Sequence, residues 1–308
     1  MTRTKFLYCF CITLFFHSYS FSQAKDSINN ELIFISDTQT PLGVEKIAHH
    51  KTQQNSIATK NILHHIANLP IQNIFMLGDV VGLGFKNKSW QIIDSFLLQA
   101  QSKQKNVYAI LGNHDVMLKP KKGVSNFEKR FANQSKTGYV VVKDSIAIVM
   151  LNSNFSKLSK KENEQQLNWY TAILSTLDTR ASVKSIIVCC HHSPYSNSKV
   201  VGCNTNVQNK FVFPFNNSTK CKLFLSGHSH NFEHFVVNNK NFCVIGGGGG
   251  IHQTIKKNTA LQNLSNNYKP LFHYLSIKRE NNKLYLTSYW FNNKQNTISN
   301  GYCFDIDL

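Results

Sequence analysis

The sequence lacks several features that would assign a function or a fold at once. It contains no internal repeat, linker or low-complexity segment, which excludes repeat arrays and linker-rich chains. No CxxC pair occurs, which argues against a structural zinc knuckle and a thioredoxin-type redox centre. The chain has 308 residues, of which 42% are hydrophobic and 16% charged. It is therefore long enough to bury a large core, and one globular domain is expected.

Acidic residues are scarce. The chain has 16 Asp and Glu against 34 Lys and Arg, which gives a formal net charge of +18. Such a balance favours anionic partners, and it does not exclude nucleic acid. The basic residues are spread through the loops, without a dense basic run or a basic helix face. The positive net charge therefore favours anionic partners only weakly.

The N-terminus is typical of a cleavable secretory signal peptide. Arg3 and Lys5 precede an apolar run at 6–16, and Ser20 and Ser22 mark a small-residue site ahead of Gln23. The run is short for a permanent membrane helix, although an uncleaved anchor is the alternative. We expect a signal peptide at 1–22 and a mature domain at 23–308 with net charge +16 (18 − 2). No later segment is apolar enough for a second span, so the mature protein should be secreted or periplasmic, without a stable membrane anchor.

Six cysteines remain after such cleavage: Cys189, Cys190, Cys203, Cys221, Cys243 and Cys303. An even number in an oxidising compartment permits disulfides, whose connectivity cannot be deduced from the sequence. Cys203 with Cys221 is the preferred pair, because both flank one polar segment. Cys189 and Cys190 lie on one predicted strand and point to opposite faces, which favours a buried thiol for at least one of them.

Strands and helices alternate through the first half, and hairpins dominate the second. Short apolar runs predict strands at 31–36, 71–77, 106–111, 185–190 and 221–225. Helical spacing predicts helices at 52–69, 89–101 with Ser89 as N-cap, and 162–177. Hairpins are expected at 139–151, 235–245 and 272–291, with a final strand at 302–306. The alternation predicts an α/β fold in which the first strands pair in parallel.

Five of these strands end in side chains that can hold a metal. The residues are Asp37 and Gln39, Asp79, Asn113 and His114, His191 and His192, and His228 and His230. Ligands of open α/β sheets bind at the carboxyl ends of the strands. Carboxylates, imidazoles and amides together suit Mn, Fe or Zn, and Asp79 is the natural bridge between two ions. Each tip taken alone could equally be a turn or a helix cap.

The order of these motifs, D-x-Q, GD, GNHD, H-x-P and GHSH, resembles the calcineurin-like metallophosphoesterase superfamily. Residues 192–194 and 227–231 also resemble purple acid phosphatases. The resemblance implies a four-layer α/β/β/α sandwich of two mixed sheets flanked by helices, with two divalent or trivalent metal ions. It would assign the residues as follows: one ion to Asp37, Gln39, Asp79 and His230; the other to Asp79, Asn113, His192 and His228; His114 to protonating the leaving oxygen or steadying the transition state; and Asp115 to orienting His114.

The chain departs from the family pattern at two positions. Gln39 stands where the superfamily usually has histidine, and a neutral amide oxygen is a weaker ligand. Gly82 stands where purple acid phosphatases have a tyrosine, so an iron–tyrosinate chromophore is not expected. The choice between His191 and His192 stays open: only His192 has the H-x-P spacing, and strand alternation sends the two side chains to opposite faces.

The resemblance predicts a phosphoric ester hydrolase in which a metal-bridging hydroxide attacks a small phosphorylated substrate. A phosphomonoesterase is favoured, and a phosphodiesterase or nucleotide hydrolase is the alternative. A non-catalytic binding protein on the same fold is a third possibility. Selection would lie in loops such as 82–89, 194–215 and 251–267. The glycine run 246–250 lacks a P-loop lysine pattern, so it is either a backbone approach to phosphate or a flexible turn. The sequence gives no oligomeric state.

Overall fold

The computed structural model describes residues 29–43, 45, 53–132, 134–256, 259–292 and 294–308. The expected signal peptide at 1–22 lies outside these residues, and its cleavage stays a prediction. Within the described part of the chain, no helix combines the length and the apolar character needed to cross a bilayer.

The first sheet has six strands in the order β12-β11-β10-β1-β2-β3. Their bounds are β1 Asn29–Ile35, β2 Ile71–Met76, β3 Asn106–Ala109, β10 His273–Glu280, β11 Lys283–Asn292 and β12 Thr297–Asp307. As predicted, β1, β2 and β3 are parallel, and they are joined through helices α2 (Gln53–Asn68) and α3 (Gln91–Ser102). The last three strands add antiparallel to the free edge of β1.

The second sheet also has six strands, in the order β4-β5-β6-β7-β9-β8. Their bounds are β4 Tyr139–Lys143, β5 Ile146–Leu151, β6 Ser185–Cys190, β7 Cys221–Ser226, β8 Phe232–Val237 and β9 Lys240–Ile245. Strands β5, β6, β7 and β9 are parallel, and β4 and β8 close the edges antiparallel. Helix α5 (Lys160–Thr179) joins β5 to β6 and begins with a capping box between Ser159 and Glu162.

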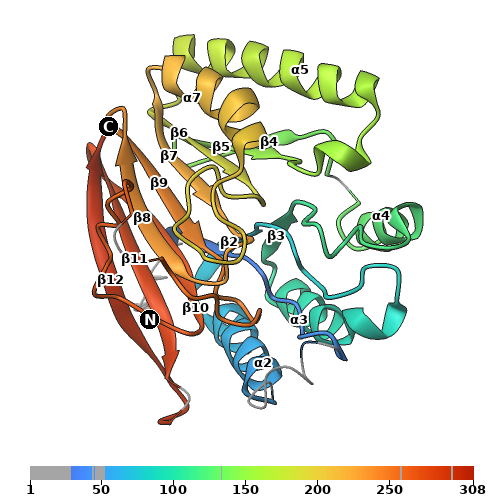
Figure 1. Ribbon diagram of the computed structural model, residues 1–308. Coiled ribbons are helices and arrows are strands. Elements are labelled where there is room, and N and C mark those ends of the chain that lie inside the picture. Colours follow the sequence, from blue (N-terminus) through green and yellow to red (C-terminus); the bar gives the residue numbers. More distant parts are fainter. Residues whose placement is uncertain (1–28, 44, 46–52, 133, 257–258, 293) are drawn as a thin grey trace, which may run out of the picture.

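The two sheets face each other, with helices on both outer sides (Figure 1). The alternation of side chains along β1 explains why the first sheet is covered on both faces. Leu32 and Phe34 enter the core between the sheets, whereas Ile33 and Ile35 enter the core beneath α2 and α3. A third core joins the outer face of the second sheet to α5. The predicted four-layer sandwich of two mixed sheets flanked by helices is confirmed.

Some local predictions were wrong. Ser89 does not cap α3, because a 3-10 turn, η1 (Asn87–Trp90), precedes the helix and places Trp90 at the N-cap. Trp90 is buried there, with Nε1 donating to the Gly84 carbonyl at 2.8 Å. The sequence also gave no warning of several short helices: α4 Pro120–Glu128, η2 Phe155–Lys157, α6 Thr205–Val207, the π-helical turn η3 Gln208–Val212 and α7 Phe213–Asn217.

The preferred disulfide was also wrong. All six cysteines in the described part of the chain are free thiols. Cys221 is fully buried in the core beneath α5, whereas Cys203 is exposed, so their side chains lie in different environments. Cys189 and Cys190 point into opposite cores of the second sheet, as the strand alternation predicted.

Candidate metal centre

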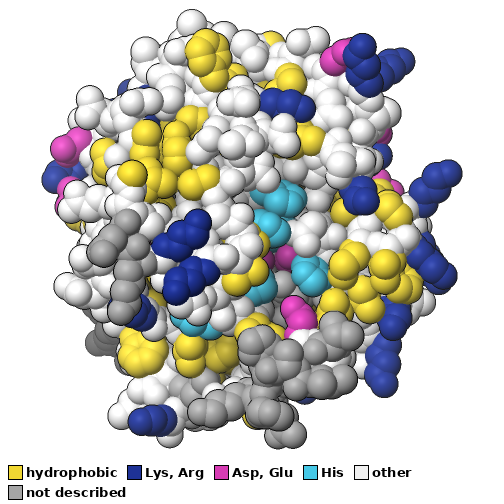
Figure 2. Space-filling view, in the orientation of Figure 1, with side chains coloured by type: hydrophobic (Ala, Val, Ile, Leu, Met, Phe, Trp, Pro, Cys, Tyr) yellow, Lys and Arg dark blue, Asp and Glu magenta, His cyan; other side chains and the backbone are white. Residues whose placement is uncertain are grey.

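The polar tips of both sheets meet at one place. The first sheet supplies Asp37 after β1, Asp79 after β2 and Asn113 after β3, while histidines follow β6 and β7 of the second sheet. Figure 2 shows histidine side chains gathered near the middle of one face, with acidic side chains lying deeper between them. The predicted meeting of strand ends therefore exists, and it spans both sheets.

The first group of possible ligands consists of Asp37, Asp79 and His230, whose ligand atoms all lie within 4.8 Å of one another. His230 Nε2 is 3.4 Å from Asp37 Oδ1. Gln39 completes the group with its amide oxygen 3.1 Å from His230 Nε2, an orientation in which its amide nitrogen donates to the carbonyls of Asp37 and Asp79 at 3.0 Å. All four residues predicted for one ion are therefore together.

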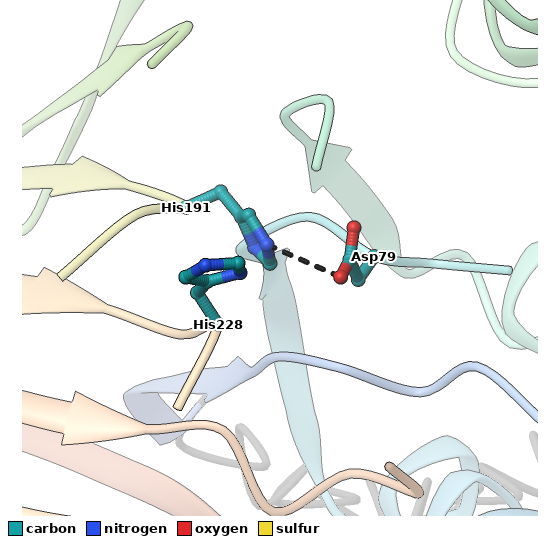
Figure 3. Close-up of side chains that lie close together, drawn as sticks. All are labelled: Asp79, His191 and His228. Atoms are coloured by element: carbon teal, nitrogen blue, oxygen red, sulfur yellow. Dashed lines mark ion pairs between the residues drawn. The ribbon is translucent and has the colours of Figure 1, made fainter. Parts of the chain in front are cut away.

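The second group consists of Asp79, His191 and His228 (Figure 3). His191 Nε2 lies 3.2 Å from Asp79 Oδ2 and 3.1 Å from Asn113 Oδ1. Asp79 belongs to both groups, which is the position that a bridging carboxylate requires. Asn113 and His228 thus lie where the sequence predicted them.

His192 lies beside this second group. Its Nδ1 is 2.8 Å from Ser153 Oγ, and its ring centroid is 4.5 Å from that of His228. Burial and the neighbouring His191 lower the pKa of His192 to about 3, so the ring is neutral. The geometry favours His191 as the ligand facing Asp79. Ser153 was missed, although the polar run Asn152-Ser153-Asn154 after a predicted strand was a usable signal.

The hydrogen bonds leave a place for cations. His191 Nδ1 donates to the Leu77 carbonyl at 3.0 Å, and His230 Nδ1 donates to the Ile251 carbonyl at 2.8 Å. Nε2 of each ring therefore faces a carboxylate, and it carries a proton in the charged ring and a lone pair in the neutral ring. Asp37 Oδ1 and Asp79 Oδ2 are buried without a hydrogen-bond partner. Buried acceptors that face one another in this way need positive charge between them, so the residues present fit metal ions.

The same closeness of carboxylates and imidazoles shifts the pKa values of His191 and Asp79. Burial lowers the pKa of His191, but the charges of Asp79 and Asp37 outweigh it and raise the pKa to about 9. Burial would raise the pKa of Asp79, yet His191, His114 and His228 hold it well below its usual range. The site therefore attracts positive charge, whether carried by a proton or by a metal ion.

The backbone at the ligands is strained. Asp37, Asp79 and His228 have positive φ angles of 58°, 47° and 64°, a conformation that non-glycine residues rarely adopt. Two motif glycines allow the loops to close on them. A Cβ at Gly112 would collide with Asp79, and one at Gly227 would collide with Ser36 and Asp37.

His114 lies at the rim of the centre. Its Nδ1 donates to the Gly82 carbonyl at 3.1 Å, and its Nε2 is 4.0 Å from Asp79 Oδ2. The structure gives Asp115 contacts other than the expected one with His114. Its buried carboxylate accepts from the backbone of Gly112 at 2.8 Å and of Val81 at 3.1 Å, which joins the GNHD loop to the GD loop. Burial and the charge of Asp79 raise the pKa of Asp115 to about 7.

Hydrogen bonds give the glycine run 246–250 a structural role. Gly248 N donates to Ser36 O at 2.8 Å and Gly250 N donates to Asp37 O at 3.0 Å. Asn55 and Thr59 of α2 donate to the carbonyls of the run. These two amide groups are engaged in holding the Asp37 segment, and the run is buried.

A family model, calcineurin-like phosphoesterase, matches residues 31–232. This chain belongs to the calcineurin-like phosphoesterase family. The family typically binds two metal ions, and the two groups above supply candidate ligands. No curated protein sequence matches the chain.

Solved structures share this calcineurin-like fold at low sequence identity. GAP50, described as the anchor in the inner membrane complex of Plasmodium, has a TM-score of 0.66 at 14% identity over 90% of this chain and 88% of its own. The purple acid phosphatase PPD1 from yellow lupin (Lupinus luteus) seeds has 0.63 at 15% identity over 90% and 53%, so this chain spans about half of PPD1. A dimetal phosphatase from Danio rerio has 0.56 at 11% identity over 91% and 99%. At these identities the likeness shows the fold alone.

Proposed function

We propose that this calcineurin-like phosphoesterase is a metal-dependent phosphoric ester hydrolase with a dinuclear centre. One observation carries the proposal: two buried carboxylate oxygens, Asp37 Oδ1 and Asp79 Oδ2, have no hydrogen-bond partner and lie 3.4 Å and 3.2 Å from the Nε2 atoms of His230 and His191. Asp37, Gln39, Asp79 and His230 would hold one ion. Asp79, Asn113, His191 and His228 would hold the other, and His192 is the alternative to His191.

Metal ions bound there would supply Lewis-acid activation of water and neutralise charge on the phosphoryl group. Side chains of the protein would position the ligand loops and supply the proton for the leaving group. Asp115 fixes the spacing of the loops that carry Asp79 and Asn113. His114, held through Nδ1 by the Gly82 carbonyl, can deliver a proton from Nε2 to the departing alcohol oxygen.

A small phosphate monoester is the favoured substrate, and a phosphodiester or nucleotide is the alternative within the same chemistry. A binding protein that kept the fold without turnover is the competing class. Retention of both ligand groups and of His114 supports the hydrolase. The predicted export would place this activity outside the cytoplasm.

The test is a panel of an aryl phosphate, a bis-aryl phosphate and nucleotides, with metal content measured on the same sample. Hydrolysis should stop with chelator and with Asp79→Ala or Asn113→Ala. His114→Gln should lower kcat by about 10²–10⁴ for alkyl phosphates, with metal content unchanged. The loss should be smaller for 4-nitrophenyl phosphate, whose leaving group needs little protonation. Full activity after chelation, or an equal loss for both leaving groups, contradicts the mechanism.

A further inference from the structure

A cavity of about 620 Å³ opens beside the metal centre, a volume in the range of small-molecule sites. Two of its lining residues flank His230. Asn231 follows it directly, and His252 follows Ile251, whose carbonyl accepts from His230 Nδ1. The rest of the lining comes mainly from residues 254–256 and 259–269, most of which belong to the loop 251–267 that the sequence analysis named for substrate selection. We call this space the amide cavity.

One wall of the amide cavity is fixed by hydrogen bonds to the centre. Ser198 and Ile255 form a β-bridge, Lys199 N donates to Thr254 O at 2.8 Å, and Lys256 N donates to Asn197 O at 2.7 Å. Gln253 ties this wall to the ligand loop, because its backbone N donates to His230 O at 3.3 Å. The cavity therefore has a defined position relative to the possible ligands.

The lining is polar and positively charged. Asn197, Asn231, Gln262, Asn263 and Asn266 contribute amides, and Phe232 and Tyr268 contribute an aromatic wall with centroids 5.2 Å apart. Asn231 is 1% exposed, and its Nδ2 has no hydrogen-bond partner. Lys256 and Lys269 also line the cavity, and none of the described lining residues is an Asp or Glu. None of the ion pairs among the described residues uses either lysine.

A hollow of about 360 Å³ on the other side of the GNHD loop has a different charge pattern. Its lining includes Lys121, Lys136 and Lys157, but also Glu128, and Lys136 is paired with Glu162 at 2.8 Å. Among the described residues, the lining of the amide cavity therefore has two lysines and no acidic side chain, whereas the lysines of the second hollow are partly offset by Glu128 and by the paired Glu162. Lysine and arginine side chains beside the histidines are visible in Figure 2.

We propose that the amide cavity binds the alcohol part of the phosphate ester and selects alcohols that carry a second anionic group. The inference rests on the proposed hydrolase function and names its substrate class: a phosphate ester whose aromatic or otherwise planar alcohol bears a carboxylate or a further phosphate. The ring of Tyr268, which packs on the buried Phe232, contacts the planar part. Lys256 and Lys269 attract the second anion, and Asn231 Nδ2 donates to an acceptor on the alcohol.

The experiment compares 3-carboxyphenyl phosphate with 3-carbamoylphenyl phosphate, which differ in charge and little in size. The wild type should have the higher kcat/KM for the carboxylate. The double variant Lys256→Gln/Lys269→Gln should lower the carboxylate-to-amide ratio several-fold, up to about 25-fold, since each exposed charge pair contributes up to about fivefold. Lys121→Gln, in the second hollow, is the matched control and should leave the ratio unchanged. The kcat for 4-nitrophenyl phosphate should stay the same in the control Lys121→Gln.

Binding of (3-carboxyphenyl)phosphonate, which has no ester bond to break, is measured on the same proteins by calorimetry. Its affinity relative to phenylphosphonate should fall in the double variant. An unchanged ratio and unchanged binding with hydrolysis intact would overturn the cavity assignment alone. A ratio that falls in Lys121→Gln would move the alcohol to the second hollow and overturn it too. No hydrolysis by the metal-loaded wild type would overturn the proposed function, and the binding measurement would still decide the cavity.

Discussion

Loading the centre with metal should raise the melting temperature of the protein, because Asp37 Oδ1 and Asp79 Oδ2 are buried without hydrogen-bond partners. An ion present at about 1,000 times its dissociation constant stabilises the folded chain by about 4.1 kcal/mol. The unfolding entropy of roughly 280 residues, at about 2.1 cal/mol/K each, is about 0.6 kcal/mol/K. Dividing the two gives a rise of about 7 °C for each ion.

Scanning calorimetry with chelator and then with Mn, Fe or Zn measures this shift. Asp79→Asn should lose most of it, because Asp79 belongs to both ligand groups. Asp144→Asn is the matched control: it removes a carboxylate that pairs with Arg279 at 3.0 Å, away from the centre, and should keep the full shift. A wild type that melts at one temperature with chelator and with all three metals would refute the reasoning. An unchanged shift in Asp79→Asn would refute the bridging role.

Three further outcomes test other parts of the molecule. His191→Asn should lower the metal content by about one ion per chain in elemental analysis, whereas His192→Asn should leave it unchanged; the reverse result would restore the choice made from the H-x-P spacing. Phe75→Ala should lower the free energy of unfolding in urea by about 3–5 kcal/mol, because the ring is fully buried between Phe34 at 4.9 Å and Tyr108 at 5.0 Å, and a cost below 1 kcal/mol would contradict that packing. Hydrogen bonds from Lys136 and Ser159 lower the pKa of Glu162 from 4.5 to about 2, so its charge stabilises the fold above pH 4.5. The difference in stability between wild type and Glu162→Gln should therefore close as the pH falls from about 4.5 to about 2, and a gap that persists at lower pH would show another cause.

The strands and their tips were predictable because their physical causes are local. Strands buried on both faces, such as β5 and β6, appear as unbroken apolar runs. The carboxyl ends of parallel strands meet at one edge, so Asp79 and Asn113 had to be neighbours. The division of the ligands between two ions came from the resemblance to the metallophosphoesterase superfamily.

The predictions that were wrong concern contacts between residues that are far apart in the sequence. The region from α6 to α7 has no helical spacing, and it folds because Phe211 and Phe215 are buried against the second sheet. The choice between His191 and His192 depends on Ser153, which holds His192 from 39 residues away. No local pattern in the sequence carries that information.

Because two carboxylates and two amides come from one sheet and imidazoles from the other, neither half of the sandwich contains a complete coordination sphere. A bound cation would hold the two sheets together at this end. Separation of the two sheets at this end would pull the ligands apart and release the cation. The metal affinity of this protein therefore depends on the stability of the contact between the sheets.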